Sequence, residues 1–154
     1  MLIVAYLHGQ AKCIIHRDIK PANVLVNFHL LAKLCDLGYS KYTAIVDSLQ
    51  TDKGNFCKWK GTKPYLSPEI LLPPYSEANT ATDIWTLAST FTEMYNEQFV
   101  WDMTDYEDIE SIFNKKQTPD LNKVPEKIQG IIKKCFSYIP LERPSALDIA
   151  KKFE

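Results

Sequence analysis

An acid, a lysine and an amide lie close together in the stretch IHRDIKPAN, which covers residues 15–23. Residues two apart in an extended loop point the same way, so Asp18 and Lys20 share a side. A carboxylate can accept or orient the proton of an attacking hydroxyl, while a neighbouring ammonium holds the negative group under attack. Asn23 adds a neutral carbonyl oxygen, which suits a hard cation such as Mg²⁺. The loop therefore has the groups to hold a reacting hydroxyl, a phosphate and a metal ion.

Asp36 is the candidate for a second oxygen ligand, because one amide and a few waters hold Mg²⁺ poorly. If the intervening chain were straight, Asp36 would lie about 43 Å from Asn23. However, NVLV (23–26) and LAKLCD (31–36) are typical of two short strands joined by a turn, which brings Asp36 back beside Asn23. Gly38 would then let the backbone turn sharply.

Apolar residues at helical spacing predict that the second half of the chain is helical. Thr80 and Asp83 fit a capping box that opens the longest helix. Thr104, Pro125 and Pro144 mark the starts of three more helices. The apolar faces of the four helices are, in order, Ile84, Leu87, Ala88, Phe91, Met94 and Tyr95; Ile109, Ile112 and Phe113; Ile128, Ile131, Ile132, Cys135 and Phe136; and Ala146, Ile149, Ala150 and Phe153.

The first half of the chain reads as short elements and loops. Residues 1–8 resemble the apolar end of a helix that stops at Gly9, and residues 13–15 a short buried strand. Residues 38–64 carry no clear periodicity and are expected to form a long loop. His8 and His29 have no partner that the sequence reveals, so both are expected at the surface or in turns.

Composition excludes several classes of protein. The chain has 154 residues, enough for one domain, and 45% of them are apolar and 24% charged. A net charge of −1 argues against a nucleic-acid binder. The longest apolar run, Leu2–Leu7, is too short to span a bilayer and lacks the features of a signal peptide. None of the four cysteines forms a C-x-x-C pair, which favours thiols in a reducing compartment, with a zinc site or disulfides as the alternative.

Five motifs, in matching order and at compatible spacings, resemble those of eukaryotic protein kinases. IHRDIKPANVLV (15–26) resembles the catalytic loop and CDLG (35–38) the metal-binding D-F-G motif. GTKPYLSPE (61–69) resembles the end of the activation segment, TDIW (82–85) the start of the long buried helix, and RPSA (143–146) the approach to the last helix. The resemblance covers nearly the whole chain and implies a kinase C-lobe, mainly α with a small β-hairpin.

The resemblance implies a role for each matching catalytic residue. Asp18 would be the catalytic base, Lys20 would contact the transferred phosphate, and Thr62 would bond near both. Asn23 and Asp36 would hold the Mg²⁺ that bridges the phosphates of ATP. The remaining member of this set is Leu25, the expected floor under the adenine.

Other matching residues would support or regulate the site. His16 and Asp83 would tie the loop to the long helix, and Glu69 and Arg143 would form a buried ion pair. Arg17 would bind a phosphate on the activation loop. Candidate acceptors of that phosphate are Ser40, Tyr42, Thr43, Ser48 and Thr51, although Lys58 stands near where a phosphothreonine often lies.

Residues 1–154 contain no G-x-G-x-x-G, no strand lysine in a V-A-I-K context and no helix with its partner glutamate. The sequence therefore predicts a C-lobe without its N-lobe. The truncation at the start is either biological or an artefact of the gene model, and the artefact is the favoured alternative. Such a chain alone would bind ATP weakly and be marginally stable. The complete protein is expected to transfer the γ-phosphate of ATP to serine or threonine of a protein substrate.

Two further expectations concern the setting of the protein. Lys20 and the segment 61–69 favour the serine/threonine type over the tyrosine type. A location inside the cell, in the cytoplasm, follows from the family. The alternative function is a truncated kinase or pseudokinase scaffold that acts by binding proteins, while the substrate and the oligomeric state stay open.

Overall fold

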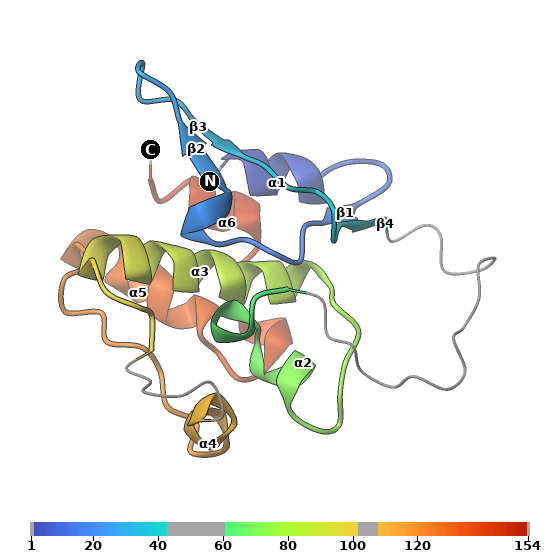
Figure 1. Cartoon of the computed structure of the whole chain (residues 1–154), viewed down its shortest axis with the longest axis vertical. Helices are drawn as coiled ribbons and strands as arrows, with labels where there is room; N and C mark the ends of the chain where they lie inside the picture. The colour runs from blue at the N-terminus through green and yellow to red at the C-terminus, as the bar shows by residue number, and fades with distance from the viewer. Residues whose placement is uncertain (1, 43–60, 102–107, 154) are drawn as a thin grey trace.

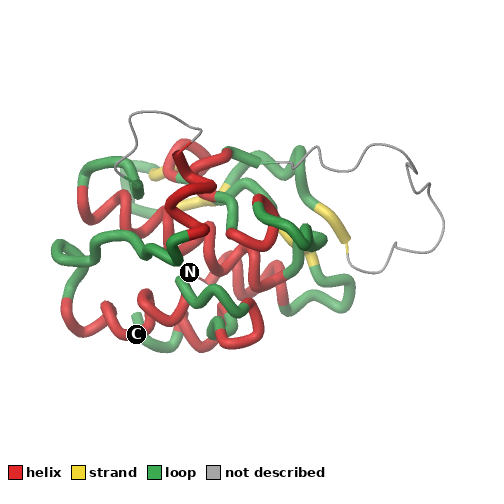
Figure 2. The backbone as a smooth tube through the Cα atoms, turned by 90° about the horizontal axis from the view of Figure 1, so that it is seen from below, coloured by secondary structure: helices red, strands yellow, loops and turns green. Residues whose placement is uncertain are grey.

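The computed structural model describes residues 2–42, 61–101 and 108–153. Helices are the main regular elements of the described backbone, and strands form only short stretches of it (Figure 2). The helices are α1 (Leu2–His8), α2 (Pro68–Leu71), α3 (Thr80–Asn96), α4 (Asp108–Asn114), α5 (Glu126–Cys135) and α6 (Ala146–Ala150), with 3₁₀ turns η1 (Pro21–Asn23), η2 (Lys63–Tyr65) and η3 (Pro140–Glu142). The strands are β1 (Ile14–Ile15), β2 (Val24–Val26), β3 (Ala32–Leu34) and β4 (Lys41–Tyr42).

Helix α3 crosses the middle of the molecule, with α1 and the β2–β3 hairpin on one side and α2 and α4 on the other (Figure 1). It begins at Asn79, whose side-chain oxygen accepts the backbone N–H of Thr82 while the Thr82 hydroxyl accepts the N–H of Asn79. The capping box predicted at Thr80 and Asp83 was therefore wrong by one residue. Asn is among the best N-cap residues. The side chain of Asp83 instead accepts hydrogen bonds from the backbone of His16 and Arg17.

Residues 82–90 of α3 are buried on every side of the helix. Its buried hydroxyls bond back to the preceding turn: Ser89 donates to the Trp85 carbonyl at 3.0 Å and Thr90 to the Thr86 carbonyl at 2.8 Å. A helix surrounded by protein does not show a one-sided apolar stripe. The predicted stripe therefore fails at its far end, where Met94 is 50% exposed.

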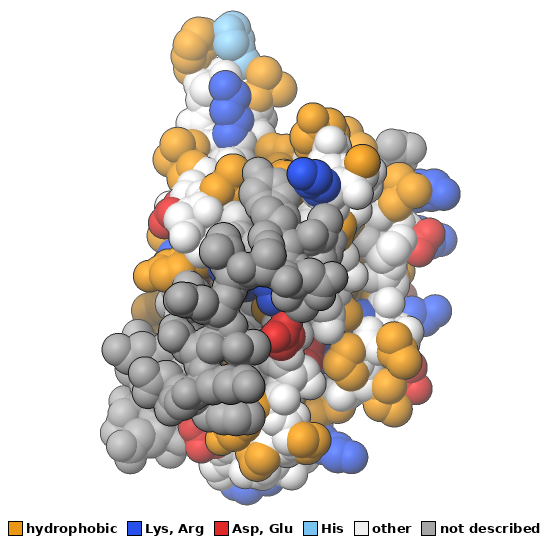
Figure 3. Space-filling view, turned by 90° about the vertical axis from the view of Figure 1, so that its right-hand side faces the viewer, with side chains coloured by type: hydrophobic (Ala, Val, Ile, Leu, Met, Phe, Trp, Pro, Cys, Tyr) orange, Lys and Arg blue, Asp and Glu red, His pale blue; other side chains and the backbone are white. Residues whose placement is uncertain are grey.

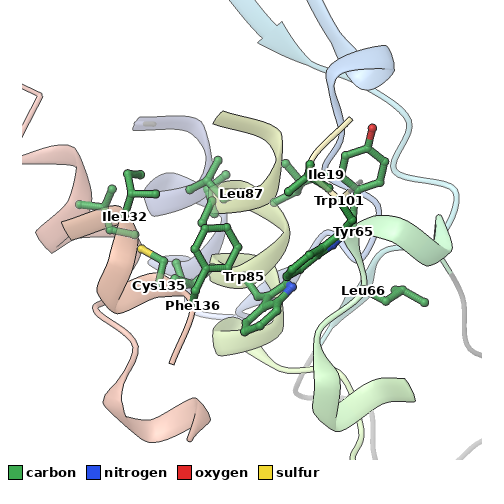
Figure 4. Packing of buried hydrophobic residues seen from close by; sticks show 14 of the residues in the cluster. Ile19, Tyr65, Leu66, Trp85, Leu87, Trp101, Ile132, Cys135 and Phe136 are labelled. Carbon is green, nitrogen blue, oxygen red and sulfur yellow. The ribbon is translucent and has the colours of Figure 1, made fainter. Parts of the chain in front are cut away.

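An aromatic cluster around Trp85 forms the centre of the core (Figure 4). The Trp85 ring meets the edges of Phe113 and Phe136, with ring centroids 5.5 and 5.1 Å apart, and stacks on Trp101 at 6.4 Å. Edge-to-face contacts of this kind stabilise a core beyond the area that they bury. Ile109, Phe113, Ile128, Ile132 and Ile149 from the predicted stripes are buried in the same core.

The predicted hairpin is confirmed. Strands β2 and β3 pair antiparallel with Val24 opposite Leu34 and Val26 opposite Ala32. The side chain of Asn27 fixes the turn by accepting the backbone N–H of His29 and of Leu31. His29 is exposed in this turn, as predicted.

One of two local predictions in the first half was wrong. The loop predicted at 38–64 contains β4, which pairs antiparallel with β1 through Ile14 opposite Tyr42. Two-residue strands leave too little periodicity to find in a sequence. The turn predicted at Gly38 is confirmed, since the backbone N–H of Ser40 donates to the carbonyl oxygen of Leu37 at 3.0 Å and closes a turn through Gly38. The left-handed residue of this segment is Asp36, with φ of 63°.

The ends of the later helices also differ slightly from the prediction. Pro125 is the N-cap rather than the first residue of α5, and Ser145, after Pro144, caps α6 by accepting the N–H of Asp148. Thr104 lies outside the described residues. In the described part of the chain, no helix combines the length and the apolar character needed to cross a bilayer. Cys35 and Cys135 are free thiols, whereas Cys57 lies outside the described residues.

Candidate active site

The carboxylate of Asp83 fixes the start of the catalytic loop, residues 16–18, through hydrogen bonds to its backbone. It is fully buried on α3 and accepts the backbone N–H of His16 at 2.8 Å and of Arg17 at 2.9 Å. Its third donor is Nε2 of His8, at 2.9 Å. The prediction that His8 lies at the surface or in a turn was therefore wrong, since its side chain is 10% exposed and bonded to Asp83.

The ring of His16 fixes the other side of the loop. It is fully buried, and its Nδ1 accepts the backbone N–H of Asp18 at 3.3 Å. Its Nε2 lies 3.2 Å from the carbonyl oxygen of Cys35. These partners require a neutral ring with its proton on Nε2. His16 thus connects the catalytic loop to the chain that leads into Asp36.

Gly61 supports the loop from the opposite segment, and sequence reasoning missed it. Its φ is +124°, and a Cβ built on it would lie 2.6 Å from the carbonyl oxygen of Arg17 and 2.8 Å from the side chain of Leu66. Arg17 is itself left-handed, with φ of 68°. Only glycine allows the two backbones to approach so closely. The presence of a glycine directly before Thr62 was the sequence feature that could have indicated this close approach.

Asp18 is the meeting point of the predicted catalytic residues. Its carboxylate is 3% exposed and accepts four hydrogen bonds. Oδ1 accepts the backbone N–H of Thr62 at 3.0 Å and its hydroxyl at 2.8 Å, while Oδ2 lies 2.9 Å from Nζ of Lys20 and 3.1 Å from Nδ2 of Asn23. Nζ of Lys20 also donates to the Thr62 hydroxyl at 2.6 Å. The structure therefore brings Asp18, Lys20, Asn23 and Thr62 into one hydrogen-bonded group.

These contacts lower the pKa of Asp18. Burial by itself raises the pKa, because it disfavours the charged form. The hydrogen bonds from Lys20 and Thr62, the positive charge of Lys20 and the hydrogen bond from Asn23 together outweigh burial. Asp18 is therefore ionised at neutral pH.

Asn23 and Asp36, the predicted Mg²⁺ ligands, lie at neighbouring positions at the base of the hairpin. The backbone N–H of Cys35 donates to the carbonyl oxygen of Asn23 at 2.9 Å, so Asp36 directly follows the residue paired with Asn23. The side-chain nitrogen of Asn23 donates to Asp18, which leaves its amide oxygen available. Oδ1 of Asp36 accepts the N–H of Gly38 at 3.1 Å, and the side chain is exposed.

Asn23 and Asp36 would give a metal ion only two side-chain ligands. Within residues 2–42, 61–101 and 108–153, no group of three or more His, Cys, Asp or Glu could hold a metal ion. Asn23 and Asp36 each carry an oxygen donor of the kind that suits a hard cation with further oxygen ligands from another molecule, such as the phosphates of a nucleotide.

A family model for the protein kinase domain matches residues 1–153. The chain belongs to the protein kinase family. It is 33% identical over 150 residues to mitogen-activated protein kinase kinase kinase YODA from Arabidopsis thaliana, a match that covers 95% of this chain and 16% of YODA. MAP kinase kinase kinase wis4 from Schizosaccharomyces pombe is 29% identical over 157 residues, or 95% of this chain and 11% of wis4.

Dual specificity protein kinase shkE from Dictyostelium discoideum is 29% identical over 154 residues, which cover 97% of this chain and 20% of shkE. The kinase chain described here therefore spans at most about a fifth of the length of these three relatives.

The side chain of Arg17 contacts the segment after Asp36 in this kinase structure. It donates through Nε to the carbonyl oxygen of Tyr39 and through Nη2 to that of Ser40, at 3.3 Å. Of the candidate phosphate acceptors, Thr43, Ser48 and Thr51 lie outside the described residues. The side chain of Leu25, the expected adenine floor, is 59% exposed on β2.

Glu69 and Arg143 form a bidentate ion pair beside the core. Nη1 and Nη2 of Arg143 lie 2.6 and 2.8 Å from the two carboxylate oxygens of Glu69. The guanidinium also lies 5.0 Å from the ring centroid of Trp85. The pair joins the start of α2 to the approach to α6, and removal of one partner would leave a buried charge unpaired.

Proposed function

We propose that this chain supplies the catalytic loop of a serine/threonine protein kinase that uses ATP and Mg²⁺. The observation that carries the proposal is the buried carboxylate of Asp18, held by Lys20, Asn23 and Thr62, whose contacts lower its pKa. A group that receives the proton of a hydroxyl needs a fixed position and the deprotonated state. The contacts of Asp18 supply both.

The lowered pKa of Asp18 favours a particular form of catalysis. A weak base removes little of the hydroxyl proton early in the reaction, so Asp18 chiefly orients the hydroxyl and receives the proton late. Transfer of a phosphoryl group depends mainly on positioning and on stabilisation of charge, which fits this role.

All four lone-pair positions of the Asp18 carboxylate are occupied, so a substrate hydroxyl has to replace one of the donors. Lys20 is the donor that can leave most easily. Its ammonium lies on a flexible stem and its side chain is 23% exposed, whereas Thr62 donates partly from its backbone. When Lys20 turns to the transferred phosphate, Oδ2 of Asp18 becomes free for the hydroxyl.

Asn23 and Asp36 are the residues that would hold Mg²⁺, as oxygen ligands at neighbouring positions of the hairpin base. The metal ion, when bound, neutralises negative charge on the phosphates of ATP. Leu25, exposed on β2, remains our candidate for contact with the adenine.

We assign the protein to the serine/threonine type because Lys20 lies on the catalytic loop and the segment 61–69 resembles that type. We also place it inside the cell, where ATP is available and thiols such as Cys35 stay reduced. An N-lobe, absent from residues 1–154, completes the nucleotide site in this proposal.

The test uses the full-length protein that carries this chain, incubated with Mg²⁺, γ-labelled ATP and matched peptides that contain serine, threonine or tyrosine. We expect label on serine and threonine, lost when EDTA removes Mg²⁺. Label confined to tyrosine would overturn the serine/threonine assignment. Folded full-length protein that transfers no label to any peptide would contradict the proposed activity and favour a scaffold.

A further inference from the structure

A short turn after α5 exposes two large apolar side chains. Leu141 is 96% exposed and Ile139 is 54% exposed, and the 3₁₀ turn η3 carries both at or next to its start. Single exposed apolar side chains are common on protein surfaces. These two differ from that case in the rigidity of the turn and in the charges around it.

Hydrogen bonds fix this turn at both of its ends. Nε of Arg143 donates to the carbonyl oxygen of Ser137 at 2.9 Å, and Arg143 itself is held by its bidentate pair with Glu69. The hydroxyl of Ser137 accepts the backbone N–H of Ile139 at 3.1 Å and donates to Oε2 of Glu142 at 2.7 Å. The backbone that carries the apolar side chains is therefore fixed before any partner binds, which reduces the entropy lost on binding.

Two lysines precede the turn on α5. Lys133 and Lys134 lie in the last turn of this helix, and both are exposed. The backbone N–H of Ser137 donates to the carbonyl oxygen of Lys134 at 3.1 Å, so the apolar turn starts directly at the end of the helix. Positive charge therefore lies close to the apolar pair.

A second pair of lysines follows α4, and Tyr138 connects it to the same turn. Lys115 and Lys116 are exposed and directly precede Gln117, whose carbonyl oxygen accepts the hydroxyl of Tyr138 at 2.7 Å. Lys116 has φ of 52°, a left-handed conformation that glycine or asparagine adopts more easily at the end of a helix. The fold itself therefore gives no reason for a lysine at this position.

The basic-edged turn consists of Ile139 and Leu141 together with the lysines at 115, 116, 133 and 134. Within the described ranges, none of these four lysines forms an ion pair with an acidic residue. Apolar side chains beside unpaired cations are complementary to an apolar stripe that has carboxylates along its edges. An acidic amphipathic helix has this pattern.

A basic and apolar surface also matches anionic lipids, but an acidic residue in the turn argues against that partner. Glu142 directly follows Leu141, is exposed, and has no ion pair in the part of the chain that the structure describes. An anionic lipid surface that met Leu141 would repel this carboxylate. A protein can instead place a hydrogen-bond donor opposite Glu142, so the charges favour a protein partner.

We propose that the basic-edged turn binds an acidic amphipathic helix of a partner protein. Apolar side chains of that helix pack on Ile139 and Leu141, and its carboxylates pair with the lysines. Helix α4, which the second lysine pair follows, lies across α3 from the β2–β3 hairpin (Figure 1), so the partner binds away from Asn23 and Asp36 at the hairpin base. Two apolar side chains bury little area, and we therefore expect a transient complex.

The test compares two helical peptides that differ only in charge. Both carry a stripe of leucines, which is edged on both sides by glutamate in one peptide and by glutamine in the other. We expect the full-length protein to bind the glutamate peptide at least about fivefold more tightly in fluorescence anisotropy, with a smaller difference at high salt. Equal affinity for the two peptides would overturn the inference. The measurement uses no nucleotide, so its outcome does not depend on the proposed kinase activity.

Two double variants assign the binding to this surface. Ile139→Ser with Leu141→Ser removes the apolar pair, and Lys133→Gln with Lys134→Gln removes two charges. All four side chains are exposed, so the core stays intact. Each double variant is expected to weaken binding of the glutamate peptide about threefold or more. Unchanged binding in either of them would overturn the inference.

Two controls exclude less specific explanations. Lys151→Gln with Lys152→Gln is an equal loss of exposed charge directly after α6 and should bind the glutamate peptide like wild type. A loss of binding in this control as large as that in the variant at 133 and 134 would indicate a general effect of charge and would contradict the proposal. Tighter binding to phosphatidylserine vesicles than to the glutamate peptide, lost in the variant at 139 and 141, would overturn it in favour of a lipid surface.

Discussion

Thr62 makes two of the four hydrogen bonds to Asp18 and also accepts one from Lys20. Thr62→Ala removes the hydroxyl, so it frees Lys20 and leaves Asp18 with one donor fewer. We expect kcat of the full-length kinase to fall at least about tenfold, whereas Thr62→Ser, which keeps the hydroxyl, should stay within about threefold of wild type. Steady-state rates at saturating Mg-ATP and peptide test this, and equal rates for the alanine and serine variants would contradict it.

The lowered pKa of Asp18 predicts an effect of pH on stability. A carboxyl whose pKa is lower in the folded protein stabilises the fold above its unfolded pKa of about 3.9, and this contribution is lost as pH falls through the folded value. Urea unfolding between pH 7 and pH 3 should therefore show a steeper loss of stability below about pH 4 in wild type than in Asp18→Asn. Parallel curves would show that the contacts of Asp18 do not favour its charged form.

Residue types predicted that Asp18, Lys20 and Asn23 lie together, and the resemblance to protein kinases added Thr62, but neither found all of the residues that support them. The chemistry of these side chains is complementary, and the structure brings Asp18, Lys20, Asn23 and Thr62 into contact. Their catalytic roles stay predictions. His8 could not be found in this way, because its partner Asp83 lies 75 residues away and the contact leaves no local pattern.

Two glycines allow a matched test of the close approach between the backbone at Gly61 and the catalytic loop at Arg17. Gly61→Ala would place a methyl group 2.6 Å from the Arg17 carbonyl in a left-handed conformation, so we expect a loss of about 2–4 kcal/mol in the free energy of unfolding. Gly130 lies within α5, where an added methyl group would meet no heavy atom within 4 Å, and Gly130→Ala should stabilise by about 0.5–1 kcal/mol. Chemical denaturation measures both, and similar changes in the two variants would contradict the close approach of Gly61 to Arg17.

At the scale of elements, prediction succeeded where a pattern was long or bounded by a clear turn. The hairpin around Asn27 and the helices α3 and α5 have such patterns. The pairing of β1 with β4 did not, because each strand has two residues. Trp85, the centre of the core, was missed because a helix buried on every side places core residues off the expected stripe.

The whole molecule exposes many large apolar side chains on α1 and on the β2–β3 hairpin. Hydrophobic side chains lie beside a histidine at the projecting end of the molecule (Figure 3). The exposed set includes Leu2, Tyr6, Leu25, Val26, Phe28, Leu30 and Leu31, with Phe28 at 89% and Leu30 at 85% exposure. Many large apolar side chains exposed on neighbouring elements are typical of a face that another domain or protein covers.

Because this face is uncovered in the 154-residue chain, the chain by itself should be marginally stable. We expect a thermal unfolding midpoint below about 55 °C without ligand, measured by scanning calorimetry. A cooperative transition above that temperature would show that these 154 residues form a sufficient core without a covering partner.

The central claim, that Asp18 receives the hydroxyl proton from its fixed position, is tested most directly by single-turnover phosphate transfer with Asp18→Asn in the full-length kinase. Asparagine has nearly the same shape but cannot accept the proton. We predict a rate at least about 100-fold lower than wild type, with peptide binding retained. A rate equal to that of wild type would contradict the account.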